Sequence, residues 1–327
     1  MGMAARGRRR SGPCLAIRVL CALFFFAAGS FFAAAADPPP ITIADVPRHT
    51  QAGPPPASGK GIPAPFPADA KLPTLWLIGD STVRNGTAGD GGNGQWGWGA
   101  PLTAYFDARK INVVNRAAGG TSARTFYNAN WKDLVALIKK GDVVIMQFGT
   151  NDGGNPATSA GDLRGVGDET QDITNRAGQP ETVHAFGWYL RQIIRETRAK
   201  GAVPIVCSLI PRKSWEPDGK LQRASGTFAG WAAQVAKAES AGFIDLNELI
   251  ARQYDVLGKE KVDLLYHQQP TAENPRGEHV HPGWDGAVLN AGIVVSGLKA
   301  LKENPLAPYF SERAKSIAPA PELKLGN

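Results

Sequence analysis

The chain has 327 residues, a formal net charge of +7 and a hydrophobic content of 43%. This composition is ordinary for a globular core, so it excludes a disordered chain and a protein made mainly of membrane spans. Five arginines within residues 1–36 carry most of the positive charge, and without that segment the formal charge is +2. The charge therefore indicates no nucleic-acid partner.

Residues 1–36 have the pattern of a secretory signal peptide. Four arginines precede a mostly apolar run over 14–36, which ends in the small residues Ala34 to Ala36. We predict cleavage before Asp37 and a secreted or periplasmic protein whose mature form does not span a membrane. An uncleaved anchor is the alternative, although Arg18 shortens the apolar run below the ~20 residues of a comfortable span.

Residues 37–72 are rich in proline, glycine and alanine and show no hydrophobic period, which is typical of a leader or linker. From residue 73 to 303, short apolar runs alternate with longer amphipathic runs. This alternation predicts a parallel β-sheet covered by helices on both faces, with all strand C-termini at one edge. The predicted strands are 75–78, 111–114, 143–148, 203–210 and 243–246. The predicted helices are 98–109, 131–140, 180–200, 228–241, 246–257 and 284–301. Residues 304–327, with four prolines, are predicted to form a C-terminal surface extension.

Three polar turns follow the first three predicted strands. They contain Ser81, the pair Gly119 and Gly120, and Asn151. A capping serine, a tight glycine turn and a strand-end asparagine would each explain one turn alone. At a common sheet edge, however, the N–H groups of Ser81 and Gly120 and the side-chain amide of Asn151 would converge as an oxyanion hole.

A base for Ser81 is available near the C-terminus, where Glu278 stands three residues before His281. His281 would take the Ser81 proton, and Glu278 would accept the other ring N–H and stabilise the imidazolium. This arrangement predicts nucleophilic ester hydrolysis without a cofactor.

Two other chemistries use overlapping residues. Asp80, Asp152, His279 and His281 could belong to a metallophosphoesterase-like site, but the chain has only five histidines and no Asp-x-His on its first strand. Two carboxylates drawn from Asp80, Asp152 and Glu278 could also hydrolyse a glycoside. That mechanism would leave the serine, histidine and oxyanion-type donors unused.

The ordered blocks resemble those of the SGNH, or GDSL-like, hydrolases, and within them the rhamnogalacturonan acetylesterase branch. Motifs that carry the closer resemblance occupy 97–99, 119–124, 164–170, 186–191 and 210–212. The resemblance implies a flavodoxin-like three-layer αβα sandwich with a central five-stranded parallel sheet and no metal. It also implies a secreted esterase that removes acetyl groups from plant cell-wall polysaccharide, with Ser81 as nucleophile, His281 as base, and Gly120 and Asn151 in the oxyanion hole.

The chain departs from the family at one catalytic position, because the family usually has aspartate where this chain has Glu278. We predict that Glu278 still pairs with His281. The expected partner is an acetylated polysaccharide or oligosaccharide; xylan and other glycans, or a non-enzymatic carbohydrate-binding protein with an impaired relay, are the alternatives. Four residues are predicted to line the substrate cleft, with loop bracing or core packing as the alternative for each: Trp98, Thr121, Arg124 and Arg164.

Overall fold

The computed structural model describes residues 46, 65–86 and 91–323. The predicted signal peptide and nearly all of the predicted 37–72 linker lie outside the described residues. No helix in the described part of the chain is long and apolar enough to cross a bilayer.

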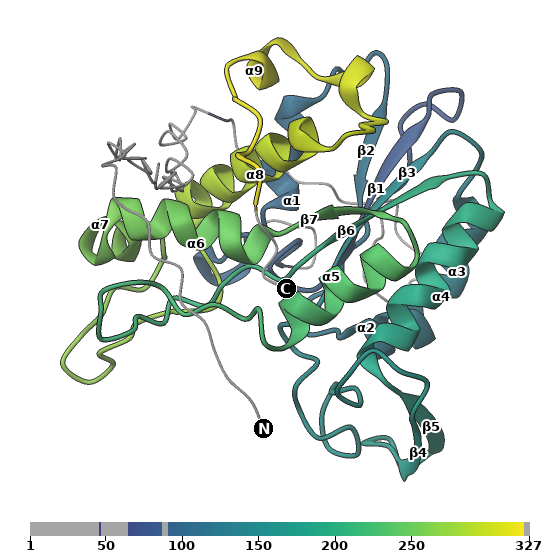
Figure 1. Cartoon of the computed structure of the whole chain (residues 1–327), viewed down its shortest axis with the longest axis horizontal. Helices are drawn as coiled ribbons and strands as arrows, with labels where there is room; N and C mark the ends of the chain where they lie inside the picture. Colours follow the sequence, from purple (N-terminus) through teal and green to yellow (C-terminus); the bar gives the residue numbers. More distant parts are fainter. Residues whose placement is uncertain (1–45, 47–64, 87–90, 324–327) are drawn as a thin grey trace, which may run out of the picture. The chain divides into compact units, whose positions relative to one another are not determined.

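A five-stranded parallel sheet forms the centre of the domain (Figure 1). Its strand order is β2-β1-β3-β6-β7, and all neighbouring strands run parallel. Counted in chain order within this sheet, the order is 2-1-3-4-5, as in flavodoxin-like folds. The predicted fold class and its five strands are confirmed. The strands are β1 (Thr74–Gly79), β2 (Asn112–Asn115), β3 (Val143–Gln147), β6 (Val203–Cys207) and β7 (Gly242–Ile244).

The strands are apolar on both faces because each face supports a separate core. In β1, Leu75 and Leu77 belong to one hydrophobic cluster, while Trp76 and Ile78 belong to another. Alternate side chains of a strand point to opposite faces, so β1 contributes to both helix layers. Residues of α1 (Gly99–Leu102), α6 (Leu246–Leu257) and α8 (Trp284–Ala300) also belong to the first cluster. Residues of α2 (Ala123–Phe126), α3 (Lys132–Leu137), α4 (Phe186–Ala199) and α5 (Phe228–Ala238) also belong to the second. These helices flank the two faces of the sheet in Figure 1.

The helices largely follow the predicted amphipathic runs. Their bounds are α1 (Gly99–Leu102), α2 (Ala123–Phe126), α3 (Lys132–Leu137), α4 (Phe186–Ala199), α5 (Phe228–Ala238), α6 (Leu246–Leu257), α7 (Lys259–Leu264), α8 (Trp284–Ala300) and α9 (Glu312–Lys315). The π-helical segment Tyr127–Trp131 joins α2 to α3.

The predicted helix over 180–200 is wrong in its first five residues. Pro180–His184 forms strand β5, which pairs antiparallel with β4 (Thr170–Thr174) as a separate hairpin. Within β5 only Val183 is fully buried, so the strand has one packed face and one open face. Helix α4 begins after this strand, at Phe186.

The described part of the predicted C-terminal extension, residues 304–323, packs against the rest of the domain. Leu306, Ala314 and Ile317 are buried in the same hydrophobic cluster as α8. The ammonium group of Lys299 donates to the carbonyl oxygens of Ala314 and Ile317, at 2.6 Å in each case. This segment is therefore held by apolar packing and by the Lys299 ammonium group.

Candidate active site

The first strand delivers Ser81 to the carboxyl edge of the sheet. β1 ends at Gly79, where a Cβ atom would lie 2.5 Å from the carbonyl oxygen of Gln147, so only glycine fits. In the turn that follows, one carboxylate oxygen of Asp80 accepts hydrogen bonds from the Thr82 N–H and hydroxyl, at 2.8 and 2.7 Å. The Ser81 Oγ lies 2.8 Å from His281 Nε2, although 200 residues separate the two in the sequence.

A chain of buried hydrogen bonds supports this turn from below. The Trp98 indole donates to Gln147 Oε1 at 2.7 Å, and the Gln147 amide donates to the Thr82 hydroxyl at 2.7 Å. Burial raises the pKa of Asp80, although the hydrogen bonds from Thr82 oppose this shift. Trp98 is only 1% exposed, which supports core packing, the alternative to its predicted place in the substrate cleft. Its indole N–H satisfies the buried Oε1 of Gln147, and the Gln147 amide in turn donates to Thr82 in the nucleophile turn.

The second and third turns lie beside Ser81. A Cβ atom on Gly119 would be 3.6 Å from the Ser81 Cβ, and Gly120 has φ +76, a conformation that favours glycine. The Asn151 amide donates to the Thr121 carbonyl oxygen at 3.0 Å. An amide nitrogen carries two N–H donors, so this bond orients Asn151 and uses only one of them.

Thr121 braces the glycine turn. Its hydroxyl donates to the Ala118 carbonyl oxygen at 2.8 Å and approaches that of Gly79 at 3.3 Å. These internal bonds occupy the hydroxyl that was predicted to contact substrate, and they tie the turn after β2 to the end of β1.

A pair of buried carboxyl groups holds the two donor turns together. The carboxylate of Asp152 accepts the Ala123 N–H with one oxygen and the Gly149 N–H with the other, both at 2.8 Å. Burial raises the pKa of Asp152 to about 6, and burial together with the Asp152 charge raises the pKa of Asp162 well above its usual value. Neither oxygen of Asp162 receives a hydrogen bond from a described residue. A proton on Asp162 would turn one of its oxygens into a donor, which could then form a hydrogen bond to Asp152.

Glu278 lies next to His281 but makes most of its contacts with the backbone. Its Oε1 is 3.6 Å from His281 Nδ1, which is longer than a hydrogen bond. The same oxygen accepts the N–H groups of His279, Val280 and His281, at 2.9, 2.7 and 3.1 Å. Burial alone would raise the pKa of Glu278, but these donors and the nearby His281 outweigh it and lower the pKa. The carboxylate is thus ionised and shapes the turn that carries the histidine.

Gln95 completes the surroundings of Glu278 and was not predicted from the sequence. Its Nε2 donates to Glu278 Oε2 at 2.9 Å, and its Oε1 accepts from Asn85 Nδ2 at 3.2 Å. The next residue, Trp96, donates its N–H to the Pro282 carbonyl oxygen at 2.8 Å. Gln95 is 183 residues from Glu278, and only its proximity to the Gly97 to Gly99 motif could have drawn attention to it.

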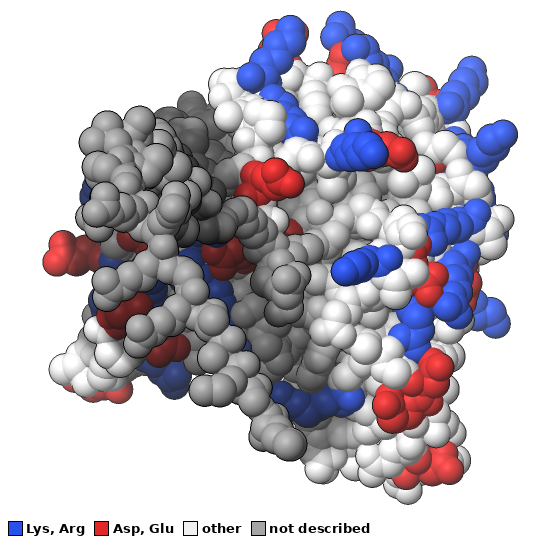
Figure 2. Space-filling view, in the orientation of Figure 1, with Lys and Arg blue, Asp and Glu red and all other residues white. Residues whose placement is uncertain are grey.

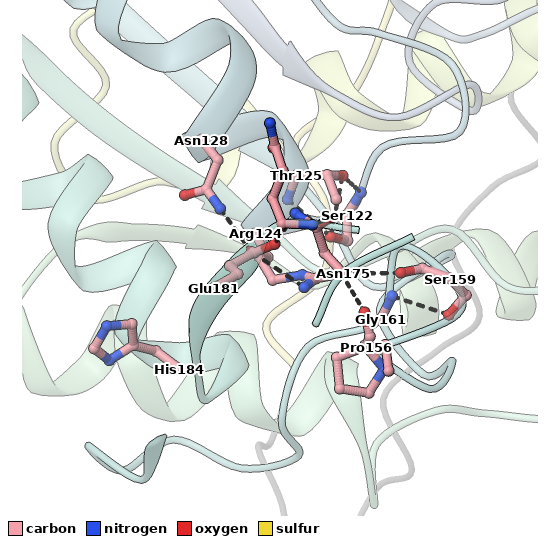
Figure 3. A network of polar contacts seen from close by, with 12 residues as sticks. Ser122, Arg124, Thr125, Asn128, Pro156, Ser159, Gly161, Asn175, Glu181 and His184 are labelled. Atoms are coloured by element: carbon pink, nitrogen blue, oxygen red, sulfur yellow. Dashed lines mark hydrogen bonds and ion pairs between the residues drawn. The ribbon is translucent and has the colours of Figure 1, made fainter. Parts of the chain in front are cut away.

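Arg124 is a structural residue, contrary to its predicted role in the substrate cleft. It is 2% exposed, forms an ion pair with Glu181 at 3.1 Å, and donates to the carbonyl oxygens of Pro156 and Ser159 at 3.1 and 2.9 Å (Figure 3). These contacts fasten the loop after β3 to the β4–β5 hairpin. By contrast, the structure leaves Arg164 exposed.

Among residues 46, 65–86 and 91–323, no three His, Cys, Asp or Glu side chains are grouped so that they could hold a metal ion. Cys207, the last residue of β6, is buried, and burial raises its thiol pKa.

Comparisons with known proteins agree with this geometry. Residues 77–289 match the model of the GDSL-like lipase/acylhydrolase family. The chain is 30% identical over 210 residues to a rhamnogalacturonan acetylesterase of Emericella nidulans, which covers 63% of this chain and 80% of that protein. It is 29% identical over 228 residues to a probable rhamnogalacturonan acetylesterase of Bacillus subtilis, YesY, covering 69% and 93%.

A solved structure shares the fold at a similar level of identity. The crystal structure of protein YxiM from Bacillus subtilis matches with a TM-score of 0.53 and 27% identity, over 70% of this chain and 56% of that one. The chain therefore belongs to the GDSL-like lipase/acylhydrolase family. Within that family it is a serine carboxylic ester hydrolase.

Proposed function

We propose that this protein is a secreted carbohydrate acetylesterase that removes O-acetyl groups from rhamnogalacturonan in plant cell-wall pectin. The observation that supports it most directly is the 2.8 Å contact between Ser81 Oγ and His281 Nε2 at the edge where the Gly120 and Asn151 turns meet. The named relatives support the substrate class. The signal-like pattern of residues 1–36 supports secretion.

Acyl transfer would proceed in two halves. In the first, Ser81 Oγ attacks the acetyl carbonyl carbon while His281 Nε2 takes the hydroxyl proton. The resulting oxyanion would accept hydrogen bonds from the N–H groups of Ser81 and Gly120 and from the Asn151 amide. When the intermediate collapses, the C–O bond to the sugar breaks and His281 returns the proton to the sugar oxygen.

In the second half, water attacks the acetyl group on Ser81 and His281 takes a proton from that water. Collapse of the second intermediate breaks the bond to Ser81 Oγ, which regains the proton, and acetate leaves. The ionised Glu278, whose Oε1 lies 3.6 Å from the ring Nδ1, would stabilise the imidazolium in both halves.

Acetate release from acetylated rhamnogalacturonan, homogalacturonan and xylan tests both the mechanism and the substrate. We expect the wild type to release acetate fastest from rhamnogalacturonan, and Ser81→Ala to lower turnover by at least ~10⁴-fold, because the nucleophile is lost. Equal release by both proteins would reject the serine mechanism, and a preference for xylan would replace the proposed substrate. No release by either protein would favour a carbohydrate-binding role.

A further inference from the structure

A partly exposed aromatic surface lies against the turn that carries Asn151. Phe228, the first residue of α5, contacts this turn twice: a Cβ atom on Gly149 would lie 3.0 Å from the Phe228 Cβ, and one on Gly153 would lie 3.4 Å from its ring. Trp231, one turn further along α5, packs edge-on against Phe228 with 4.8 Å between the ring centroids. Trp231 is only partly buried, so this surface reaches solvent beside a predicted oxyanion donor.

An exposed arginine lies over these rings. The guanidinium carbon of Arg164 is 6.0 Å from the Phe228 ring centroid and 5.8 Å from that of Trp231. In the described part of the chain no carboxylate lies within ion-pair distance of Arg164. Arg124 differs, because its guanidinium group forms an ion pair with Glu181 and donates to two carbonyl oxygens.

A second exposed arginine touches the same turn. Arg212 donates through Nη2 to the Thr150 carbonyl oxygen at 3.1 Å, and it too has no ion pair with any described residue. The turn that carries Asn151 therefore contacts one uncompensated cation directly and a second through Phe228. On the one face that Figure 2 draws, Lys and Arg side chains lie among Asp and Glu side chains.

We propose that Arg164, Arg212 and Trp231 form a binding subsite for a sugar that carries a carboxylate, such as a uronic acid residue next to the acetylated sugar. Guanidinium groups bind carboxylates through paired, charge-assisted hydrogen bonds, and an indole ring packs on the apolar C–H face of a pyranose. This subsite deepens the proposed function, on which it rests, by assigning the recognition of an acidic glycan to particular side chains.

Steady-state kinetics with three acetyl esters tests the subsite. The substrates are an acetylated galacturonate-containing oligosaccharide, an acetylated xylooligosaccharide and 4-nitrophenyl acetate. For Arg164→Gln and Arg212→Gln we expect KM on the acidic substrate to rise about 10-fold more than KM on the other two esters, as loss of a charge-assisted contact would give. Trp231→Ala should raise KM for both sugars and leave 4-nitrophenyl acetate unaffected. Arg313→Gln removes the same charge from α9 and serves as the matched control, with no expected change on any substrate.

The proposal is overturned if the two arginine variants leave KM on the acidic substrate unchanged, or if they lower activity equally on all three esters. A binding measurement separates this failure from failure of the esterase function. We expect an unacetylated galacturonate oligosaccharide to bind Ser81→Ala in calorimetry, and to bind at least ~10-fold more weakly when Arg164→Gln and Arg212→Gln are added. Equal binding by both proteins would reject the subsite, whether or not the wild type releases acetate.

Discussion

The two halves of the candidate active site are built differently. Ser81, Gly120 and Asn151 follow three adjacent strands, and the turns that carry them are fixed by backbone N–H groups that donate to the buried Asp80 and Asp152 side chains. Glu278 and His281 lie in a segment between α7 and α8 that has no regular secondary structure. Its geometry depends on polar contacts with Gln95, on backbone hydrogen bonds from Trp96 and Lys213, and on the bonds that Glu278 accepts from its own turn.

The two halves should therefore respond differently to substitution. The sheet determines the positions of the nucleophile and donor turns, so changing one donor should remove a specific interaction and leave the others in place. The position of His281, in contrast, depends on a few hydrogen bonds that one substitution could release. Mutations in the donor turns should therefore weaken the stabilisation of the transition state. Mutations near Glu278 should instead move His281 away from Ser81.

The largest expected loss of kcat comes from a mutation in the donor turns. Asn151→Ala should lower kcat by ~10²–10³-fold with little change in KM, because an oxyanion donor acts on the charge that develops in the transition state. Kinetics with 4-nitrophenyl acetate measure this directly. A loss that appears only in KM would contradict the role of Asn151.

On the base side, Glu278→Ala should lower kcat by about 10²-fold, because His281 loses both its nearest carboxylate and the cap that holds its turn. Glu278→Asp keeps the charge and removes one methylene, so it should retain more activity than Glu278→Ala. Gln95→Ala leaves the carboxylate in place and removes one of its donors, so a loss of about 10-fold is expected. The same kinetic assay ranks the three variants. A wild-type rate for Glu278→Ala would eliminate Glu278 from the relay.

Gln269→Ala is a matched control for Gln95→Ala. Gln269 also supports this region, since its amide donates to the carbonyl oxygens of Asp263 and Tyr266 and not to the Glu278 carboxylate. It should lower the melting temperature and leave kcat unchanged. If both glutamine variants lose the same activity, Gln95 acts only through loop stability.

The smallest effect concerns stability rather than rate. Folding raises the pKa of Asp152 to about 6 and also raises the pKa of Asp162. As pH rises from about 4, these two carboxyl groups therefore lose their protons in the unfolded chain before they lose them in the folded protein. The stability of the wild type should fall through pH 6 and above. Asp162→Asn replaces the shared proton with an amide donor, so at pH 8 it should exceed the wild type by about 1–3 kcal/mol.

Calorimetric melting at pH 4 and pH 8 checks the sign of this effect. The gap between Asp162→Asn and the wild type should be small at pH 4 and wide at pH 8. Asp133→Asn, which removes one charge from an exposed position, should follow the wild type at both values. Parallel pH dependence for all three proteins would contradict a shared proton.

The sequence predicted most of the fold because buried parallel strands and amphipathic helices leave periodic patterns. It failed over Pro180–His184, where only Ala185 separates a short strand from α4, and over residues 304–323, where prolines accompany buried side chains. In both places the deciding contacts are made with distant parts of the chain. Local patterns do not record such contacts.

For the candidate site, the sequence by itself determined which residues have the right chemistry and that Ser81, Gly120 and Asn151 would meet, because strand C-termini share one edge of a parallel sheet. Only the tertiary structure decided which nearby polar and aromatic residues are free for substrate. It buried Trp98 and Arg124 as braces and left Arg164 and Arg212 exposed. Burial depends on packing between segments far apart in the chain. The sequence therefore does not show whether an arginine pairs with a carboxylate inside the protein or is free to bind one from a substrate.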